Sequence, residues 1–129
     1  MNNDTLNRIV RAAMDEATVQ TIPISISIVD DAGRLVAFMR QEGCSYFAIE
    51  ASRKKAITAS QLKAPTHALA DAAQKNPALQ AAFTKNDEIL TLPGGLPIVQ
   101  NGKVVGGLGV AGGDFNQDKT IAEKAFAIA

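Results

Sequence analysis

Apolar residues near the start of the chain recur at steps of three and four positions. The repeat spans residues 5–20 and consists of Leu6, Ile9, Val10, Ala13, Met14 and Ala17. This spacing puts the apolar side chains on one face of an amphipathic helix. Asp4 or Thr5 stands where a side-chain oxygen would cap the first turn. The pattern therefore predicts a helix over residues 5–20.

The spacing changes from helical to alternating after Pro23. In the next segment the apolar residues Ile24, Ile26 and Ile28 alternate with Ser25 and Ser27. A turn sequence at 30–33 (DDAG) then leads into a second apolar segment at 35–39 (LVAFM). Two short β segments joined by such a turn predict a hairpin, and its small serine face suits close contact with a helix.

The middle of the chain predicts three helices. Residues 45–63 contain no glycine or proline and carry a stripe of mainly small residues: Ala48, Ala51, Ser52, Lys55, Thr58, Ala59 and Leu62. Small side chains let a helix lie close to a sheet. Two shorter helices are expected over 65–75, starting at Pro65 or Thr66, and over 77–84.

The second half predicts further strands around a glycine loop. Residues 89–92 (ILTL) are typical of a short strand and run into the loop 93–97 (PGGLP). A second hairpin follows, with Asn101-Gly102 as its type I′ turn. Glycines at 106, 107 and 109 leave its last strand with few side chains. This indicates a bulge, or close approach of another backbone or of a ligand. Asp118 is expected to cap a last helix from residue 119 to the C-terminus.

These segments predict one α+β domain over residues 1–129, with an antiparallel sheet of about five strands flanked by helices. Lysine plus arginine equals aspartate plus glutamate at 13 each, without a long run of either sign, so nucleic acid is not expected as a partner. No stretch approaches the roughly 20 apolar residues of a membrane span or the core of a signal peptide, so a cytoplasmic location is expected. The lone Cys44 excludes an internal disulfide, and no side-chain spacing predicts a metal site.

Four segments together resemble the GlcG/HbpS-type haem-binding family, which includes the C-terminal domain of PduO corrinoid adenosyltransferases. They are 29–36 (VDDAGRLV), 50–59 (EASRKKAITA), 94–98 (GGLPI) and 102–110 (GKVVGGLGV), the last followed by Gln117-Asp118. The resemblance implies a profilin-like α/β/α sandwich, a homo-tetramer or homo-octamer, a catabolic operon and, for several members, haem. Ala48, Ala111 and Lys119 depart from residues common in the family, so no catalytic role is carried over to them.

The candidate ligand site is built around the glycine loop. The loop residues Gly94, Gly95, Leu96 and Pro97 can present backbone N–H groups to a carboxylate, although a plain turn between strands has the same composition. Thr66 is a frequent residue of the family at its position. His67, the only histidine, is a candidate axial ligand of haem or an acid–base group, or else a neighbour of a helix cap.

Two charged residues of the segment 45–63 are candidate catalytic groups. Lys55 lies on the small-residue stripe, where it must pair with an acid, extend to solvent or meet an anionic ligand. Glu50 is a candidate general base or metal ligand, or a solvated carboxylate. Its spacing from Lys54 predicts an ion pair that leaves Lys55 as the freer charge.

Three functions remain open from the sequence. The first is a small-ligand-binding protein, with haem as the candidate cofactor and a pocket near a subunit interface. The second is a cofactor-free hydrolase or isomerase acting on a small carboxylate-bearing catabolic intermediate, with Lys55 as anion anchor, Glu50 as base and the loop amides as oxyanion donors. The third is a structural assembly domain. Self-association is expected because the bare strand and alanine-rich helices would leave a low-relief apolar surface exposed.

Overall fold

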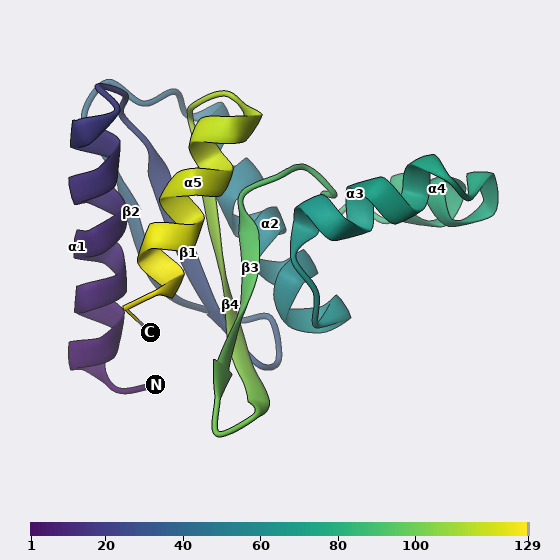
Figure 1. The fold of residues 1–129 in the computed structure, drawn as a ribbon, viewed down its shortest axis with the longest axis horizontal. Coiled ribbons are helices and arrows are strands. Elements are labelled where there is room, and N and C mark those ends of the chain that lie inside the picture. The colour runs from purple at the N-terminus through teal and green to yellow at the C-terminus, as the bar shows by residue number, and fades with distance from the viewer. Residues whose placement is uncertain (129) are drawn as a thin grey trace.

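The computed structural model describes residues 1–128, whose central part is built in three layers (Figure 1). A four-stranded antiparallel sheet forms the middle layer. Helices α1 (Asn3–Val19) and α5 (Phe115–Phe126) cover one face of the sheet, and α2 (Phe47–Leu62) covers the other. The expected α+β fold, with helices flanking one antiparallel sheet, is confirmed.

The strand order in the sheet is β2-β1-β4-β3. The strands are β1 (Ser25–Asp30), β2 (Leu35–Arg40), β3 (Gly95–Gln100) and β4 (Lys103–Ala111). Each predicted hairpin supplies two neighbouring strands, and β1 pairs with β4 in the centre. In the turn between β3 and β4, Asn101 and Gly102 have φ values of 53° and 74°. These positive values are those that the Asn-Gly pair predicts for a type I′ turn.

The expectation of about five strands is wrong, because residues 89–92 form no strand. Their backbone groups bind side chains instead of a neighbouring strand. The Leu90 amide donates to Thr58 Oγ1 at 2.9 Å, and the Leu92 carbonyl accepts a hydrogen bond from Thr66 Oγ1 at 2.6 Å. Side chains from α2 and α3 therefore hold this segment, which pairs with no strand of the sheet.

Two predicted helix caps are also wrong. Helix α1 is capped by Asn2, whose side chain accepts a hydrogen bond from the Thr5 amide at 2.9 Å, so Thr5 lies within the helix. Helix α5 is capped by Asp114, whose carboxylate accepts from the Gln117 amide while the Gln117 side chain accepts from the Asp114 amide. This reciprocal capping box satisfies two free amides at once. The helix therefore begins at Phe115 and not at residue 119 as expected, and Asp118 is free for another role.

The two faces of β1 are buried in different ways. Ile26 and Ile28 of the strand, with Ile24 just before it, form the main core with α1, α5, β3 and β4. On the opposite face, Ser27 Oγ lies 2.7 Å from Ser52 Oγ of α2. A Cβ atom on the neighbouring Gly109 of β4 would lie 2.1 Å from the Ser52 carbonyl oxygen. Of the alternatives predicted for the β4 glycines, close approach of a backbone is the one observed at Gly109, and α2 supplies that backbone.

Helices α3 (Thr66–Gln74) and α4 (Pro77–Thr84) form an arm that projects from this body (Figure 1). Both begin where the sequence predicts, and Asn76 caps α4 through a hydrogen bond from the Leu79 amide. No residue of α4 is buried, although the helix is rich in alanine and apolar side chains. The arm is therefore anchored to the body mainly through the first turn of α3.

Candidate functional site

His67 lies in the first turn of α3, between two hollows that adjoin it. The larger, of about 580 Å³, is bounded by α3, α4 and the segment before β3, with apolar walls from Pro77, Leu92, Pro93 and Phe115. The smaller, of about 310 Å³, is lined by Pro65, Leu96, Pro97, Val99, Glu123 and Phe126. Together they form what we term the His67 groove. Among residues 1–128, the buried Nδ1 of His67 has no hydrogen-bond partner.

Thr66 holds the glycine loop against the arm. Its fully buried hydroxyl donates to the Leu92 carbonyl at 2.6 Å and accepts from the Gly95 amide at 2.8 Å. The Thr66 side chain thus faces into the body, while its neighbour His67 lines the groove. These contacts give Thr66 a structural role beside the candidate ligand site.

The glycine loop is buried and packed tightly. Gly94 has φ +122°, and a Cβ on Gly95 would lie 2.6 Å from both the Lys55 carbonyl oxygen and Thr66 Cγ2. In this conformation the Gly95 amide donates to Thr66, so it is not free to bind an anion. A valine at position 95 is thus expected to disturb folding itself. The loop residues that do line the His67 groove are Pro93, Leu96 and Pro97.

Lys55 forms a buried ion pair with Asp118. Its Nζ lies 3.0 Å from Asp118 Oδ2 and 2.9 Å from the Val110 carbonyl oxygen, while Asp118 Oδ1 accepts from the Gly113 amide at 2.8 Å. The two side chains are 3% and 4% exposed. Burial lowers the pKa of Lys55 and raises that of Asp118, and the attraction between the pair opposes both shifts. Of the alternatives predicted for Lys55, pairing with an acid is the one observed.

Glu50 lies on a different side of α2 from Lys55 and is solvent-exposed. Its carboxylate binds Arg53 at 2.7 Å, not Lys54 as the spacing predicted, and Arg53 also binds Glu88 at 2.9 Å. The hydrogen bond from Arg53 lowers the pKa of Glu50. A carboxylate with a lowered pKa is a weaker base. The structure therefore does not bring Glu50 together with Lys55 or with the glycine loop.

Comparison with known proteins identifies the family. The family model described as "Haem degrading protein HbpS-like" matches residues 1–127. The chain belongs to the HbpS-like family. The resemblance found in its motifs is confirmed, and residues 1–128 form a fold seen in solved HbpS-like structures.

Three HbpS-like relatives illustrate the range of the match. The crystal structure of a PduOC:haem complex superposes with a TM-score of 0.94 at 32% identity, covering 100% of this chain and 94% of that one. Crystalline HbpS gives a TM-score of 0.89 at 29% identity, covering 99% and 89%. The corrinoid adenosyltransferase PduO of Salmonella typhimurium is 34% identical over 95% of this chain, which spans 37% of the PduO length.

Asp118 is the partner of Lys55 that sequence reasoning missed in this HbpS-like chain. The Gln117-Asp118 motif was part of the family resemblance, but its aspartate was interpreted as a helix cap. The motif itself carried no sign that Lys55 would be its partner.

Among residues 1–128 no group of three or more His, Cys, Asp or Glu side chains is arranged to hold a metal ion. No helix in that range is long and apolar enough to cross a membrane.

Replacing Thr66 by valine is expected to lower the free energy of unfolding by about 1–3 kcal/mol. The change leaves the buried Gly95 amide and Leu92 carbonyl without their hydroxyl partner. Urea denaturation measures the loss. The control is Thr84→Val, because the Thr84 hydroxyl binds the Gln80 carbonyl on the exposed face of α4. If both variants lost the same free energy of unfolding, the Thr66 hydroxyl would not be holding the glycine loop in place.

Proposed function

We propose that this chain binds haem in the His67 groove. The family description names haem, and the PduOC structure that matches the whole chain is a haem complex. Within this chain, the observation that carries the proposal is the His67 ring. It is the sole imidazole, it lines both hollows, and its buried Nδ1 has no partner among the described residues. An unsatisfied buried nitrogen requires an explanation, and a missing ligand supplies one.

The residues of the groove fit a porphyrin in two respects. Haem iron takes an imidazole nitrogen as an axial ligand, and the porphyrin ring needs apolar walls. His67 offers the nitrogen, and the prolines and phenylalanines on either side offer the walls. No lysine or arginine lines either hollow, whereas Asp71 and Glu123 do. The affinity is therefore expected to rest on ligation and apolar contact, not on cations that pair with the propionates.

Self-association is part of the same proposal, as a homo-tetramer or homo-octamer. The support is the arm: α4 is rich in apolar side chains, none of its residues is buried, and it borders the His67 groove through Pro77 and Gln80. Apolar surface of this kind is commonly covered by a partner. A neighbouring copy that covers the arm would bring a subunit interface close to the groove. The cytoplasmic location stays a prediction.

The contacts around Glu50, Lys55 and Gly95 give no comparable support to a hydrolase or isomerase. The ammonium of Lys55 is paired with Asp118, the Gly95 amide is paired with Thr66, and Glu50 is held by Arg53 on another surface. An oxyanion site needs free donors that converge on one point. We therefore advance haem binding alone.

His67→Ala is expected to lower haem affinity at least about tenfold, the effect of losing roughly 1.4 kcal/mol. Titration with haemin, followed through the Soret band, measures both the affinity and the ligand set. The band should shift in the variant, and free imidazole should restore it by occupying the vacated position. Arg34→Gln, on the turn between β1 and β2 and outside the His67 groove, serves as the control and should bind as the unmodified chain does.

An unchanged Soret band in His67→Ala would overturn the proposal for this site. The iron would then be held by a methionine, Tyr46 or Cys44, or by surface contacts without a defined ligand. Circular dichroism of both variants verifies that they are folded. Haemin mixed with imidazole in the absence of protein gives the reference spectrum for the rescue experiment.

A further inference from the structure

Strand β2 is the edge strand that the helices cover least. Helix α2 covers β1, β4 and β3 on one face, while on the other face α5 packs on β3 and β4 and α1 packs on β1 and β2. As a result the large apolar residues of this edge strand are exposed: Leu35 by 51%, Val36 by 43%, Phe38 by 37% and Met39 by 42%. Apolar exposure concentrated on one element marks a surface with a binding role.

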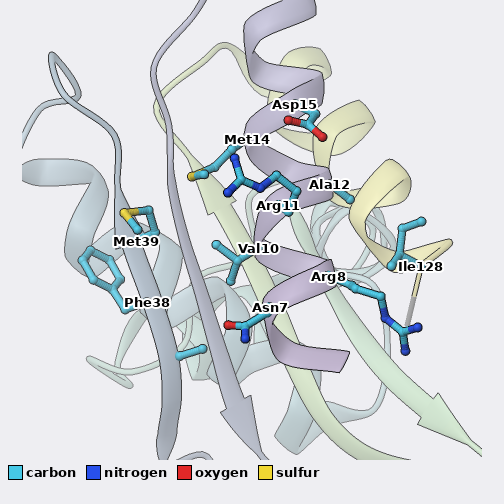
Figure 2. Close-up of a pocket in the computed structure, with 11 residues that line it drawn as sticks. Asn7, Arg8, Val10, Arg11, Ala12, Met14, Asp15, Phe38, Met39 and Ile128 are labelled. Carbon is cyan, nitrogen blue, oxygen red and sulfur yellow. The ribbon is translucent and has the colours of Figure 1, made fainter. Parts of the chain in front are cut away.

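A groove of about 850 Å³ lies between β2 and the outer flank of α1 (Figure 2). Its apolar lining comes from both elements and from the C-terminal segment: Val10, Ala12, Met14, Ala37, Phe38, Met39 and Ile128. Ligand pockets commonly have volumes of about 300–1,000 Å³, mainly apolar walls and a few polar groups. The groove has a volume within this range and mainly apolar walls, and it is open to solvent along its length; none of its lining residues belongs to the His67 groove.

The charged groups of the α1–β2 groove are mainly cationic. Arg8, Arg11 and Asp15 line it. Figure 2 shows the Arg11 guanidinium turned toward Met14 and the groove, while the Asp15 carboxylate points to the other side of α1. Among residues 1–128 neither arginine forms a salt bridge. Arg8 donates a long hydrogen bond of 3.5 Å to the Thr5 hydroxyl. Within residues 1–128, the Arg11 guanidinium beside this apolar wall therefore has no anionic partner.

We propose that the α1–β2 groove is a second binding site, for an amphipathic carboxylate. An aliphatic chain or aromatic ring lies against Met14, Phe38 and Met39, and its carboxylate binds the Arg11 guanidinium. The planar guanidinium donates two parallel hydrogen bonds that match a carboxylate. The guanidinium is exposed to solvent, so the affinity comes from the paired hydrogen bonds together with the apolar contact. Charge complementarity thus selects an anion, and the walls select one with an apolar body.

Decanoate is the probe for this site, and its uncharged analogue decanol is the control ligand. The fluorescent sulfonate 8-anilinonaphthalene-1-sulfonate reports occupancy, since a competitor displaces it. Decanoate should displace it at a concentration at which decanol does not. Arg11→Gln should weaken decanoate binding about tenfold, the usual scale for loss of one charged hydrogen-bonding partner. Arg34→Gln, on the turn before β2 and outside the groove, should leave it unchanged.

A second variant tests the apolar wall. Met39→Glu places a carboxylate on the exposed strand and should weaken decanoate binding by repulsion without disturbing the core, as unchanged circular dichroism would verify. Equal displacement by decanoate and decanol, or normal binding by Arg11→Gln, would overturn the proposal. Sedimentation gives a further contrary outcome: if Met39→Glu dissociates an oligomer and decanoate does not bind, a second copy of the chain covers this groove. His67→Ala should bind decanoate normally, so the two sites can fail independently.

Discussion

Lys55→Met is expected to lower the free energy of unfolding by about 3–5 kcal/mol, the usual loss when one partner of a buried ion pair is removed. The Asp118 carboxylate would remain 4% exposed without its ammonium partner, and the Val110 carbonyl would lose a donor. Asp118→Asn tests the pair from the other side, since it removes the charge but keeps an oxygen for the Gly113 amide. Urea denaturation of both variants measures the loss.

The double variant Lys55→Met/Asp118→Asn distinguishes a paired charge from two unrelated contacts. Because neither charge is then left alone, the double variant should lose no more than one of the single variants. Arg34→Met removes a cation from an ion pair with Asp30 that is exposed to water, and it should change the unfolding midpoint little. Additive losses in the double variant would show that the two residues act separately.

Gly109→Ala is expected to destabilise the protein by more than about 3 kcal/mol, at the upper end of the range for overpacking. The added Cβ would lie 2.1 Å from the Ser52 carbonyl oxygen and 2.6 Å from the Ala56 nitrogen, both in the backbone of α2. A helix backbone cannot rotate away as a flexible side chain does, so α2 must move off the sheet.

The matched control is Gly102→Ala in the β3–β4 turn. That position has a φ of +74° and nothing within 4 Å of an added Cβ, so only the backbone conformation is penalised. The expected loss is about 1–2 kcal/mol. Chemical denaturation compares the two alanine variants directly. Similar losses would mean that α2 has more freedom against β4 than the structure indicates.

Local patterns predicted most of the elements because their causes are local. The alternation of apolar and polar residues predicted the β1–β2 hairpin, and the pair Asn101-Gly102 predicted the β3–β4 turn. The bare glycines of β4 predicted a close backbone, and α2 supplies it. The strand expected at residues 89–92 is absent, because an apolar run does not reveal which groups its backbone will hydrogen-bond. Those partners, Thr58 and Thr66, lie 32 and 26 residues away in the sequence from Leu90 and Leu92.

The site was harder to predict than the fold because its contacts are long-range. Lys55 and Asp118 are 63 residues apart, and no spacing rule connects them. The sequence left three alternatives for Lys55, namely an acidic partner, an anionic ligand or extension to solvent. It identified His67 as the sole imidazole, but the hollows on either side depend on where the arm, β3 and α5 meet. The sequence does not predict the groove beside β2, because it depends on how α1 packs next to the edge strand.

Most positions of the arm can be substituted with little effect on the stability of the fold. Only Thr66 and Ala73 are buried in α3, and no residue of α4 is. Substitutions at exposed positions away from special contacts usually alter stability by less than about 0.5 kcal/mol. The arm nevertheless supplies one wall of the His67 groove. That wall can therefore diverge between related chains while the sheet and its helices stay constant, which gives selection a route to new ligands without rebuilding the fold.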